Sequence, residues 1–460
     1  MPISNVHPAS YRDPSGYIFT QDSIIYRQVN EVYAPHYELL MSSGLYQQLI
    51  EKKWLIEHEE VNDLHTSSDD QQKTFKILRP QRIGFITYPY EWCFSQLKEA
   101  ALLTLKIQQL AMINGMSLKD ATAFNITFDG SRAVFIDTLS FEKYEASRPW
   151  IAYRQFCETF LAPLLLAAWQ DPDLIRLMVT YPDGIPIEIC ASLLPLSSKF
   201  KSISSLHIHL QSGIKGQVAK SGKSSGSFNA NKLERIISHL ISGVSSLQLN
   251  KKISNWSDYY TQTILQDNYL KDKERIVEEM IDKISFSTSI DLGSNTGQFA
   301  LMLEKKGKKV IALDIDPLCV ERLYQHSSEK KLNITTLVSD LVNPAPAIGW
   351  NNKERAALLQ RLNGDLVLAL ALVHHLCIGK NLPFASLAEV TSNMGRYLII
   401  EFVPKEDEKV KKLLSFREDI FQEYDIEHFR SAFAQYFEIL QTSNVGNSRR
   451  TLFLMKKKNA

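Results

Sequence analysis

Residues 289–297 read Ser-Ile-Asp-Leu-Gly-Ser-Asn-Thr-Gly, and this stretch decides the fold of the C-terminal half of the chain. It begins as an apolar strand and ends in a turn that contains Gly293 and Gly297. A helix-like run follows, and then a second strand that ends at Asp314. Glycines between a strand and a helix let the backbone approach a ligand closely, and an acid after the next strand can accept hydrogen bonds from a ribose. The pattern therefore predicts a site for a nucleotide-like ligand.

Strands and helices alternate after residue 250. Strands are expected at 289–292, 310–313, 335–338, 366–372, 397–402 and 451–455, with helical runs between most of them. This alternation predicts an α/β fold, in which helices cover both faces of a mostly parallel sheet. Residues 433–455 read as a strand, a turn and a returning strand. The sheet is therefore expected to end in an antiparallel hairpin.

The composition is that of a soluble globular protein, with 44% hydrophobic and 22% charged residues. A chain of 460 residues is too long for one ordinary domain, so two or three domains are expected. Lys and Arg (52 residues) balance Asp and Glu (51 residues), and this balance does not indicate a broad surface for nucleic acid.

The five cysteines are dispersed without a Cys-x-x-Cys pair, which favours reduced, buried thiols and predicts no metal site. The N-terminal residues lack a charged stretch followed by an apolar core, so no secretory signal is expected. The apolar run at 160–169 is too short to span a bilayer. We therefore expect a cytoplasmic protein without a membrane span.

Residues 289–455 resemble the class I S-adenosylmethionine-dependent methyltransferases. The first motif of that family, Asp/Glu-x-Gly-x-Gly-x-Gly, is present as Asp291-Leu-Gly293-Ser-Asn295-Thr-Gly297, in which Asn295 replaces the middle glycine. Asparagine tolerates left-handed dihedral angles better than most residues, so the turn is expected to survive the replacement. The resemblance implies a Rossmann-like sheet and S-adenosylmethionine as the cofactor.

The resemblance also implies roles for single residues. The turn packs against the methionine part of the donor, Asp314 binds the ribose hydroxyls, and Asp340, after the third strand, contacts the adenine amine. The residues implied for donor binding are Asp291, Gly293, Ser294, Asn295, Gly297, Asp314, Ile315, Asp340, Leu341, Ala371 and Tyr260. For Tyr260, plain packing is an equal alternative.

Candidates for a catalytic base follow the fourth and fifth strands. His374 and His375 are the first, because imidazole titrates near neutrality, and Glu401 is the second. Packing or helix capping is an equal alternative for either histidine, and capping is the alternative for Glu401. A strand that ends in His-His-Leu is common among family members that act on small molecules. The Asn-Pro-Pro-Tyr type motif of members that methylate nucleobase amines is missing.

Two other interpretations of the turn fit less well. A dinucleotide site would show Gly-x-Gly-x-x-Gly, whereas this turn has Gly-x-x-x-Gly. A purely structural turn is disfavoured because four matching elements occur in order along the chain, at 291, 314, 340 and 365–376.

Residues 117–142 resemble the catalytic segment of the protein-kinase-like fold. In that fold an Asp, an Asn five residues later and an Asp after the next strand serve as base and two metal ligands. Asp120, Asn125 and Asp137 match this spacing, after a long amphipathic helix predicted at 95–115. Residues 88–92 correspond to the hinge between the lobes.

The segment departs from the kinase pattern at several places. Leu118 stands where the family has His, and Asp137 is followed by Thr-Leu instead of Phe-Gly. No Gly-rich loop is visible near the start, and Arg27 occupies the place of the nucleotide-binding lysine. We expect a kinase-like domain that is structural or holds the acceptor. A working site with ATP and Mg, and a coincidental match, are the alternatives.

These patterns divide the chain into a kinase-like N-lobe (1–92), a helical C-lobe (93–215), a linker and helix (216–250) and a methyltransferase domain (251–460). The linker contains a Gly/Ser-rich stretch at 220–231. The combination is similar to a group of bacterial two-part proteins of the nodulation-protein type.

The resulting hypothesis is a methyltransferase that acts on a small-molecule or glycan-like acceptor. Nucleic acid is not expected as a partner. The alternatives are a bifunctional enzyme with an ATP-dependent phosphotransferase domain, and a non-enzymatic interaction protein that keeps the methyltransferase fold.

Overall fold

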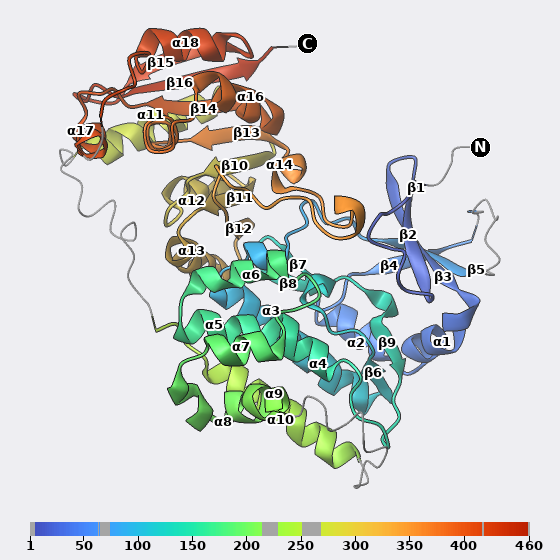
Figure 1. The fold of residues 1–460 in the computed structure, drawn as a ribbon. Helices are drawn as coiled ribbons and strands as arrows, with labels where there is room; N and C mark the ends of the chain where they lie inside the picture. The colour runs from blue at the N-terminus through green and yellow to red at the C-terminus, as the bar shows by residue number, and fades with distance from the viewer. Residues whose placement is uncertain are drawn as a thin grey trace. The chain divides into compact units, whose positions relative to one another are not determined.

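The computed structural model describes residues 5–62, 64, 74–213, 229–250, 268–415 and 418–458. The chain divides into two compact units. Unit 1 comprises Met1–Lys252 and Pro346–Ala356, and unit 2 comprises Ile253–Ala345 and Ala357–Ala460. The segment Pro346–Ala356 therefore belongs to unit 1, although it lies within the C-terminal half of the sequence. Figure 1 labels the elements of both units.

Unit 1 begins with an antiparallel sheet in the order β1-β2-β3-β5-β4. Its strands are β1 (Asn5–Val6), β2 (Gly16–Gln21), β3 (Ile24–Asn30), β4 (His58–Val61) and β5 (Thr74–Pro80). Helices α1 (Ala34–Ser42) and α2 (Leu45–Glu51) connect β3 to β4.

The rest of unit 1 is mainly helical. Helix α3 (Phe94–Ile113) confirms the long amphipathic helix predicted at 95–115, because Leu97, Ala101 and Leu105 form a buried stripe along it. Two small antiparallel sheets follow, β6 (Met116–Leu118) with β9 (Phe141–Lys143) and, between them in the chain, β7 (Ile126–Asp129) with β8 (Arg132–Phe135). The remaining helices are α4 (Tyr153–Phe156), α5 (Ala162–Trp169), α6 (Leu177–Thr180), α7 (Ile187–Leu193), α8 (Ser202–Ser204), α9 (Leu210–Gly213) and α10 (Ala230–Ser246).

Unit 2 is built on a seven-stranded sheet in the order β12-β11-β10-β13-β14-β16-β15. The strands are β10 (Thr288–Leu292), β11 (Lys309–Asp314), β12 (Ile334–Val338), β13 (Gly364–Ala369), β14 (Gly395–Phe402), β15 (Phe437–Asn444) and β16 (Thr451–Lys457). Strands β10 to β14 pair in parallel, whereas β16 is antiparallel to both β14 and β15. The predicted parallel sheet with a C-terminal antiparallel hairpin is confirmed.

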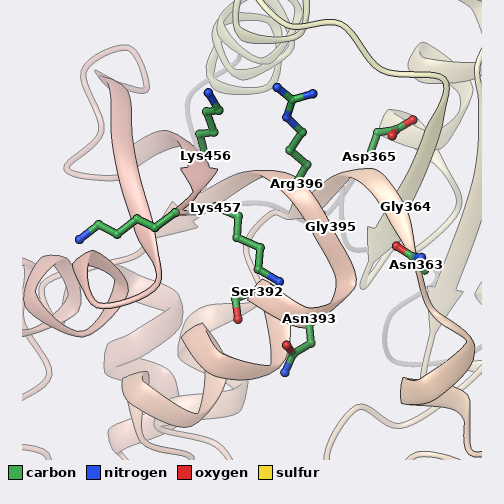
Figure 2. A pocket seen from close by; sticks show the side chains of 10 residues that line it. Asn363, Gly364, Asp365, Ser392, Asn393, Gly395, Arg396, Lys456 and Lys457 are labelled. Atoms are coloured by element: carbon green, nitrogen blue, oxygen red, sulfur yellow. The ribbon is translucent and has the colours of Figure 1, made fainter. Parts of the chain in front are cut away.

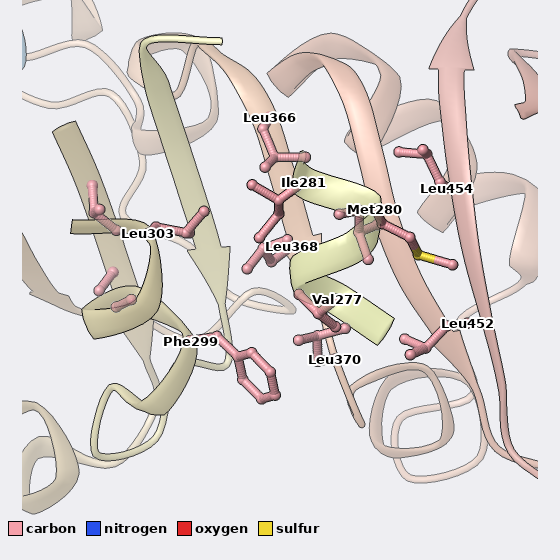
Figure 3. Close-up of a cluster of buried hydrophobic side chains, with 14 of the residues drawn as sticks. Val277, Met280, Ile281, Phe299, Leu303, Leu366, Leu368, Leu370, Leu452 and Leu454 are labelled. Carbon is pink, nitrogen blue, oxygen red and sulfur yellow. The ribbon is translucent and has the colours of Figure 1, made fainter. Parts of the chain in front are cut away.

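One face of this sheet packs against α11 (Tyr269–Ile281) and α12 (Gln298–Lys305). Figure 3 shows Val277, Met280 and Ile281 of α11 beside Leu366 and Leu368 of β13. Alternate residues of a strand point to the same face, so the two leucines lie together in this core. Val367, the residue between them, is buried as well and points to the other face, which explains why this parallel strand is a nearly continuous apolar run.

The opposite face is covered by α16 (Phe384–Met394) and α18 (Ile426–Ala434). Phe429 of α18 is at the centre of the aromatic cluster on this face. The centroid of its ring lies 5.5 Å from the ring centroid of Phe384, 5.3 Å from that of Phe402 and 5.2 Å from that of Phe453. Helices therefore cover both faces, as predicted. The other helices of unit 2 are α13 (Pro317–Lys330), α14 (Leu358–Arg361), α15 (Val373–Cys377) and α17 (Glu408–Leu414).

The predicted fourth strand, 366–372, is wrong at its C-terminal end. β13 stops at Ala369, and Ala371 adopts a left-handed conformation with φ of 53°. A residue in that conformation cannot continue a strand. Its N–H donates instead to the side chain of Glu401, at 2.7 Å. The sequence pattern missed this because the chain stays apolar through Leu372.

All five cysteines are free and buried, as the sequence predicted. None of the helices in the described ranges combines the length and the apolarity that a bilayer span requires.

Replacing Leu368 by Ala should destabilise unit 2 strongly. Leu368 is fully buried between α11 and the centre of the sheet, so the change removes apolar contacts and leaves a cavity. We expect a loss of about 2–5 kcal/mol in the free energy of unfolding, measured by calorimetric or chemical unfolding. Leu440→Ala, at a position that is 45% exposed in β15, is the control and should change stability by less than about 0.5 kcal/mol. Equal stability of the two variants would contradict this account of the core.

Candidate functional site

A cavity of about 370 Å³ opens at the carboxyl ends of β10, β11 and β13. The chain runs from β10 outward to β11 and β12, and then returns to the other side of β10 as β13. In open α/β sheets this switch point is where ligands bind. The cavity is lined by Gly293, Asn295, Leu313, Asp314, Ile315, Ser339, Asp340, Leu341, Val342, Leu370, Ala371, Leu372, His375, Leu376, Gly379 and Lys380.

The turn after β10 forms one wall of the cavity. Asn295 adopts φ of 50°, and this confirms that asparagine at the middle position of the motif takes a left-handed conformation. Gly297 has φ of 90° and begins α12, where a Cβ atom would lie 2.2 Å from Cδ1 of Leu323. Gly297 is therefore required for helix packing, and it does not line the cavity.

Asp314 connects this turn to the end of β11. One of its carboxylate oxygens accepts the N–H of Asn295 at 2.7 Å, and the other accepts the N–H of Asp316 at 2.9 Å. Burial raises the pKa of Asp314 to about 6, although these bonds oppose the rise. Asp314 nevertheless lines the cavity.

Residues after β12 form the next part of the wall. Asp340 is half-buried, and its carboxylate accepts the N–H of Val342 at 2.9 Å. Leu341 and Ile315 add apolar surface on either side. The buried hydroxyl of Ser339 has no hydrogen-bond partner within the described chain, so a bound ligand could supply one. Sequence reasoning missed Ser339, because a serine before the predicted acid carries no recognisable signal.

The two histidines that follow β13 have different surroundings. His375 lines the cavity, and burial together with Arg450 and Lys409 lowers its pKa to about 4. His374 is completely buried, neither ring nitrogen has a hydrogen-bond partner among the described residues, and burial holds its pKa well below its usual value. His374 therefore does not reach the cavity, and of the two histidines only His375 lines it.

Glu401 also lies away from the cavity, and its geometry does not fit the base role considered from the sequence. It is completely buried and pairs with Nζ of Lys273 at 2.6 Å. Burial opposes its ionisation, but Lys273 and Arg450 outweigh that effect and hold the pKa of Glu401 below its usual value. A carboxylate that is charged and already paired is a poor proton acceptor. The sequence could not reveal this pairing, because Lys273 lies 128 positions earlier.

The remaining predicted donor-site residues lie behind the cavity wall or outside the described part of the chain. Asp291 and Ser294 are buried and do not line the cavity. Burial and the charge of Asp314 raise the pKa of Asp291 to about 7. Tyr260 falls outside the described residues. The cavity thus brings together Gly293, Asn295, Asp314, Ile315, Asp340, Leu341, Ala371 and His375 from the predicted set.

A larger hollow of about 550 Å³ lies at the other end of the parallel strands, where β13 and β14 begin (Figure 2). It surrounds the first residues of β13 and β14 and is lined by Arg396, Lys456 and Lys457. Asp365 also lines it, and four hydrogen bonds of 2.8–3.1 Å from residues 287 and 288 lower the pKa of Asp365 to about 2 despite burial. None of the predicted site residues lines this hollow, so we place the candidate site at the smaller cavity.

In unit 1 the structure brings Asp120, Asn125 and Asp137 close together. Asn125 hydrogen-bonds the carboxylate of Asp120, and burial with the nearby charge of Asp137 raises the pKa of Asp120. The Nδ2 of Asn125 donates to the hydroxyl of Ser140 at 3.0 Å, and that hydroxyl donates to Asp137. The spacing seen in the sequence therefore corresponds to a real cluster.

Asp137 is also engaged by a cation of the protein. Nη1 of Arg27, in β3, lies 2.5 Å from its Oδ1, and the N–H of Leu139 donates to the same oxygen. Within the described ranges, no group of three or more His, Cys, Asp or Glu side chains is placed to hold a metal ion. Arg27 thus pairs with the carboxylate of Asp137, which the kinase resemblance implies as a metal ligand.

Comparison with known proteins identifies the family. The chain is 34% identical over 457 residues to the nodulation protein NoeA of Rhizobium meliloti, and the alignment covers 97% of this chain and 95% of that protein. The chain therefore belongs to the NoeA family. No protein-family model matches it.

Two shorter or weaker similarities concern methyltransferases. A probable ribosomal RNA small subunit methyltransferase A of Methanosphaera stadtmanae is 36% identical over 75 residues, which is 16% of this chain and 28% of that protein. The solved structure of the N-methyltransferase NodS from Bradyrhizobium japonicum aligns with 42% of this chain and 99% of its own, at 11% identity and a TM-score of 0.31.

The raised pKa of Asp291 predicts how stability depends on pH. Between the unfolded pKa of about 3.9 and the folded pKa of about 7, the folded protein holds a proton that the unfolded chain has lost. This contribution to stability therefore falls as pH rises through that window. Asp291→Asn removes the group, so relative to the natural protein it should gain up to about 1.4 kcal/mol for each pH unit between 5 and 7.

Asp365→Asn is the matched control, measured by chemical unfolding over the same pH range. Its carboxylate has a lowered pKa of about 2, so its stabilisation is lost only as pH falls below about 4. This variant should show a constant offset from the natural protein between pH 5 and 8. A constant offset for Asp291→Asn as well would show that its carboxyl is not perturbed.

Proposed function

We propose that this member of the NoeA family is an S-adenosylmethionine-dependent methyltransferase that acts on a small-molecule or glycan-like acceptor. One observation carries the proposal: the cavity at the carboxyl edge of the sheet is lined by Asn295, Asp314 and Asp340 from three successive strand ends. These are the positions at which the resemblance to class I methyltransferases implies contacts to the methionine part, the ribose and the adenine.

The chemistry of the wall suits such a donor. The carboxylate of Asp314 accepts backbone hydrogen bonds from Asn295, Ile315 and Asp316, and because its two oxygens offer about four lone-pair sites it retains capacity for a ribose hydroxyl. Leu341 and Ile315 offer apolar surface for a flat ring, and Asp340 offers acceptors for an amine at the same place. The hydroxyl of Ser339 would gain the partner that it lacks within the protein.

The bound donor supplies an electrophilic methyl group on a sulfonium, so the protein is required mainly to align an acceptor and to take its proton. His375 is the residue that we assign to proton removal. It lines the cavity and is neutral at neutral pH, and because its pKa is lowered to about 4 it is a weaker base than an ordinary imidazole. His374 and Glu401 have no place in this step, because both are buried away from the cavity.

Two features of the sequence support the acceptor class. The near-zero net charge disfavours a polyanionic acceptor, and the His374-His375-Leu376 sequence, which lies in α15 after the fourth strand, resembles that of methyltransferases of small molecules. Unit 1 would hold the acceptor or serve a structural purpose.

A second candidate function is ATP- and Mg-dependent phosphotransfer in unit 1. The observation that favours it is the convergence of Asp120, Asn125 and Asp137. The ion pair of Asp137 with Arg27 weighs against it. Magnesium-dependent ATP binding that is lost in Asp137→Ala would support this activity, and calorimetry without any ATP binding would exclude it.

The donor assignment predicts that Asp314→Ala weakens binding of S-adenosylhomocysteine, the demethylated donor. Loss of hydrogen bonds from ribose hydroxyls to a charged acceptor should lower affinity by roughly 10- to 150-fold in isothermal titration calorimetry. Asp365→Ala, at the opposite edge of the sheet, is the control and should bind as the natural protein does. Failure of the natural protein to bind either S-adenosylmethionine or S-adenosylhomocysteine would overturn the proposal. Binding without methyl transfer to any acceptor would favour an interaction protein.

The affinity for S-adenosylhomocysteine should also fall at acidic pH. The pKa of Asp314 is about 6 in the free protein, and the ionised carboxylate accepts hydrogen bonds from the ribose hydroxyls most strongly. Below pH 6 the affinity should decrease by up to about tenfold per pH unit, because binding then requires the loss of one proton. The dependence should vanish in Asp314→Asn. An affinity that stays constant from pH 7.5 to 5 would show that the ionised carboxylate does not contact the ligand.

A further inference from the structure

Glu401, at the end of β14, is the centre of a buried polar network. Its side chain is fully buried, one carboxylate oxygen accepts Nζ of Lys273 at 2.6 Å, and the other accepts the hydroxyl of Tyr269 at 2.5 Å. Nη1 of Arg450, the residue before β16, lies 3.7 Å from the carboxylate and donates to the Tyr269 hydroxyl at 2.9 Å. A buried carboxylate is stable only with partners of this kind.

Arg450 fixes the network to a further element. It is 1% exposed, and its guanidinium donates two hydrogen bonds, of 2.8 and 3.0 Å, to the carboxylate of Asp407. Asp407 in turn caps α17 through the N–H of Lys409. Two acids and two cations thus connect α11 and β14 with the residues that precede β16 and α17, and the two negative and two positive charges balance.

The network has one contact that leads to the cavity. The oxygen of Glu401 that binds Lys273 also accepts the N–H of Ala371 at 2.7 Å. Ala371 lines the cavity with φ of 53°, a conformation that an alanine adopts only when its surroundings enforce it. The next residue, Leu372, lines the cavity as well, and its carbonyl accepts the N–H of His375 at 3.0 Å.

The opposite wall is built in the same way. Asn295 has φ of 50°, and its N–H donates at 2.7 Å to the buried carboxylate of Asp314. A turn on each side of the cavity therefore contains a non-glycine residue in the left-handed conformation. In both turns a buried carboxylate accepts the N–H of that residue. The difference is that Asp314 also faces the cavity, whereas Glu401 does not.

We propose that Glu401 is a positioning residue for the donor site: it holds Ala371 in the left-handed conformation, and through Leu372 it sets both the cavity wall and the placement of His375. The inference rests on the proposed function for its effect on donor affinity. Its effect on the backbone at 371 is independent of that function.

The test is a double-mutant cycle of Glu401→Gln and Ala371→Gly. Glutamine keeps one oxygen acceptor but loses the charge that binds Lys273, so the anchor at 371 weakens. S-adenosylhomocysteine affinity should fall roughly tenfold in Glu401→Gln, within the range for coupled neighbours. Glycine adopts positive φ without an anchor, so adding Ala371→Gly should recover most of that loss. A role in stability alone would lower the melting temperature, leave affinity unchanged and show no coupling to residue 371.

Hydrogen exchange provides a readout that does not need the ligand. Amides of residues 370–376 should exchange faster in Glu401→Gln than in the natural protein, while Asp365→Asn, which weakens the other end of β13, should leave them unchanged. Should Glu401→Gln fail to fold, Tyr269→Phe keeps all charges, removes one hydrogen bond to Glu401 and should show the same changes to a smaller extent. Unchanged exchange and affinity in a folded variant would overturn the inference. If the natural protein binds no donor while exchange still responds, the proposed function fails and the positioning role stands.

Discussion

Two backbone N–H groups, each donated to a buried carboxylate, determine the shape of the cavity in unit 2. Asp314 holds Asn295 on one wall, and Glu401 holds Ala371 on the other, both at 2.7 Å. Holding a non-glycine residue in the left-handed conformation costs of order 1–3 kcal/mol of conformational free energy. Such residues persist only where the surrounding structure enforces that conformation. The rest of unit 2 supplies that surrounding structure: the sheet sets the ends of β10 and β13 side by side, and Lys273 of α11 and Arg450, just before β16, keep Glu401 ionised.

Units 1 and 2 use buried charge in different ways. In unit 2 the acids that line the cavity keep acceptor capacity toward it, as Asp314 and Asp340 do. In unit 1 the cluster of Asp120, Asn125 and Asp137 already has partners within the protein. Arg27 forms an ion pair with Asp137, and the hydroxyl of Ser140 donates a hydrogen bond to it. The first arrangement suits the capture of a ligand with hydroxyl and amine donors. The second suits a scaffold, which agrees with a unit that holds an acceptor or supports the fold.

Much of unit 2 could be predicted because its information is local. The period of apolar residues located the strands, the turn motif located Gly293 and Asn295, and the acids at 314 and 340 were expected at strand ends that parallel pairing brings to one edge. The end of β13 could not be predicted, because an apolar run continues past the point where Ala371 turns. Nor could the two adjacent histidines be separated: on a short helix one side chain enters the core and the other reaches the cavity, and only packing decides which.

The sequence by itself determined the alternation of elements, the antiparallel C-terminal hairpin and the residues that reach the carboxyl edge, because periodicity and strand ends are read over a few neighbouring positions. The tertiary structure decided what Glu401, His374 and Arg27 do. Glu401 takes its charge state from Lys273 and Arg450, and Arg27 is paired with Asp137, although these partners lie far away in the chain; His374 is governed by its complete burial. Burial removes water as the default partner, so the charge and the role of such a group depend on which distant side chains replace it.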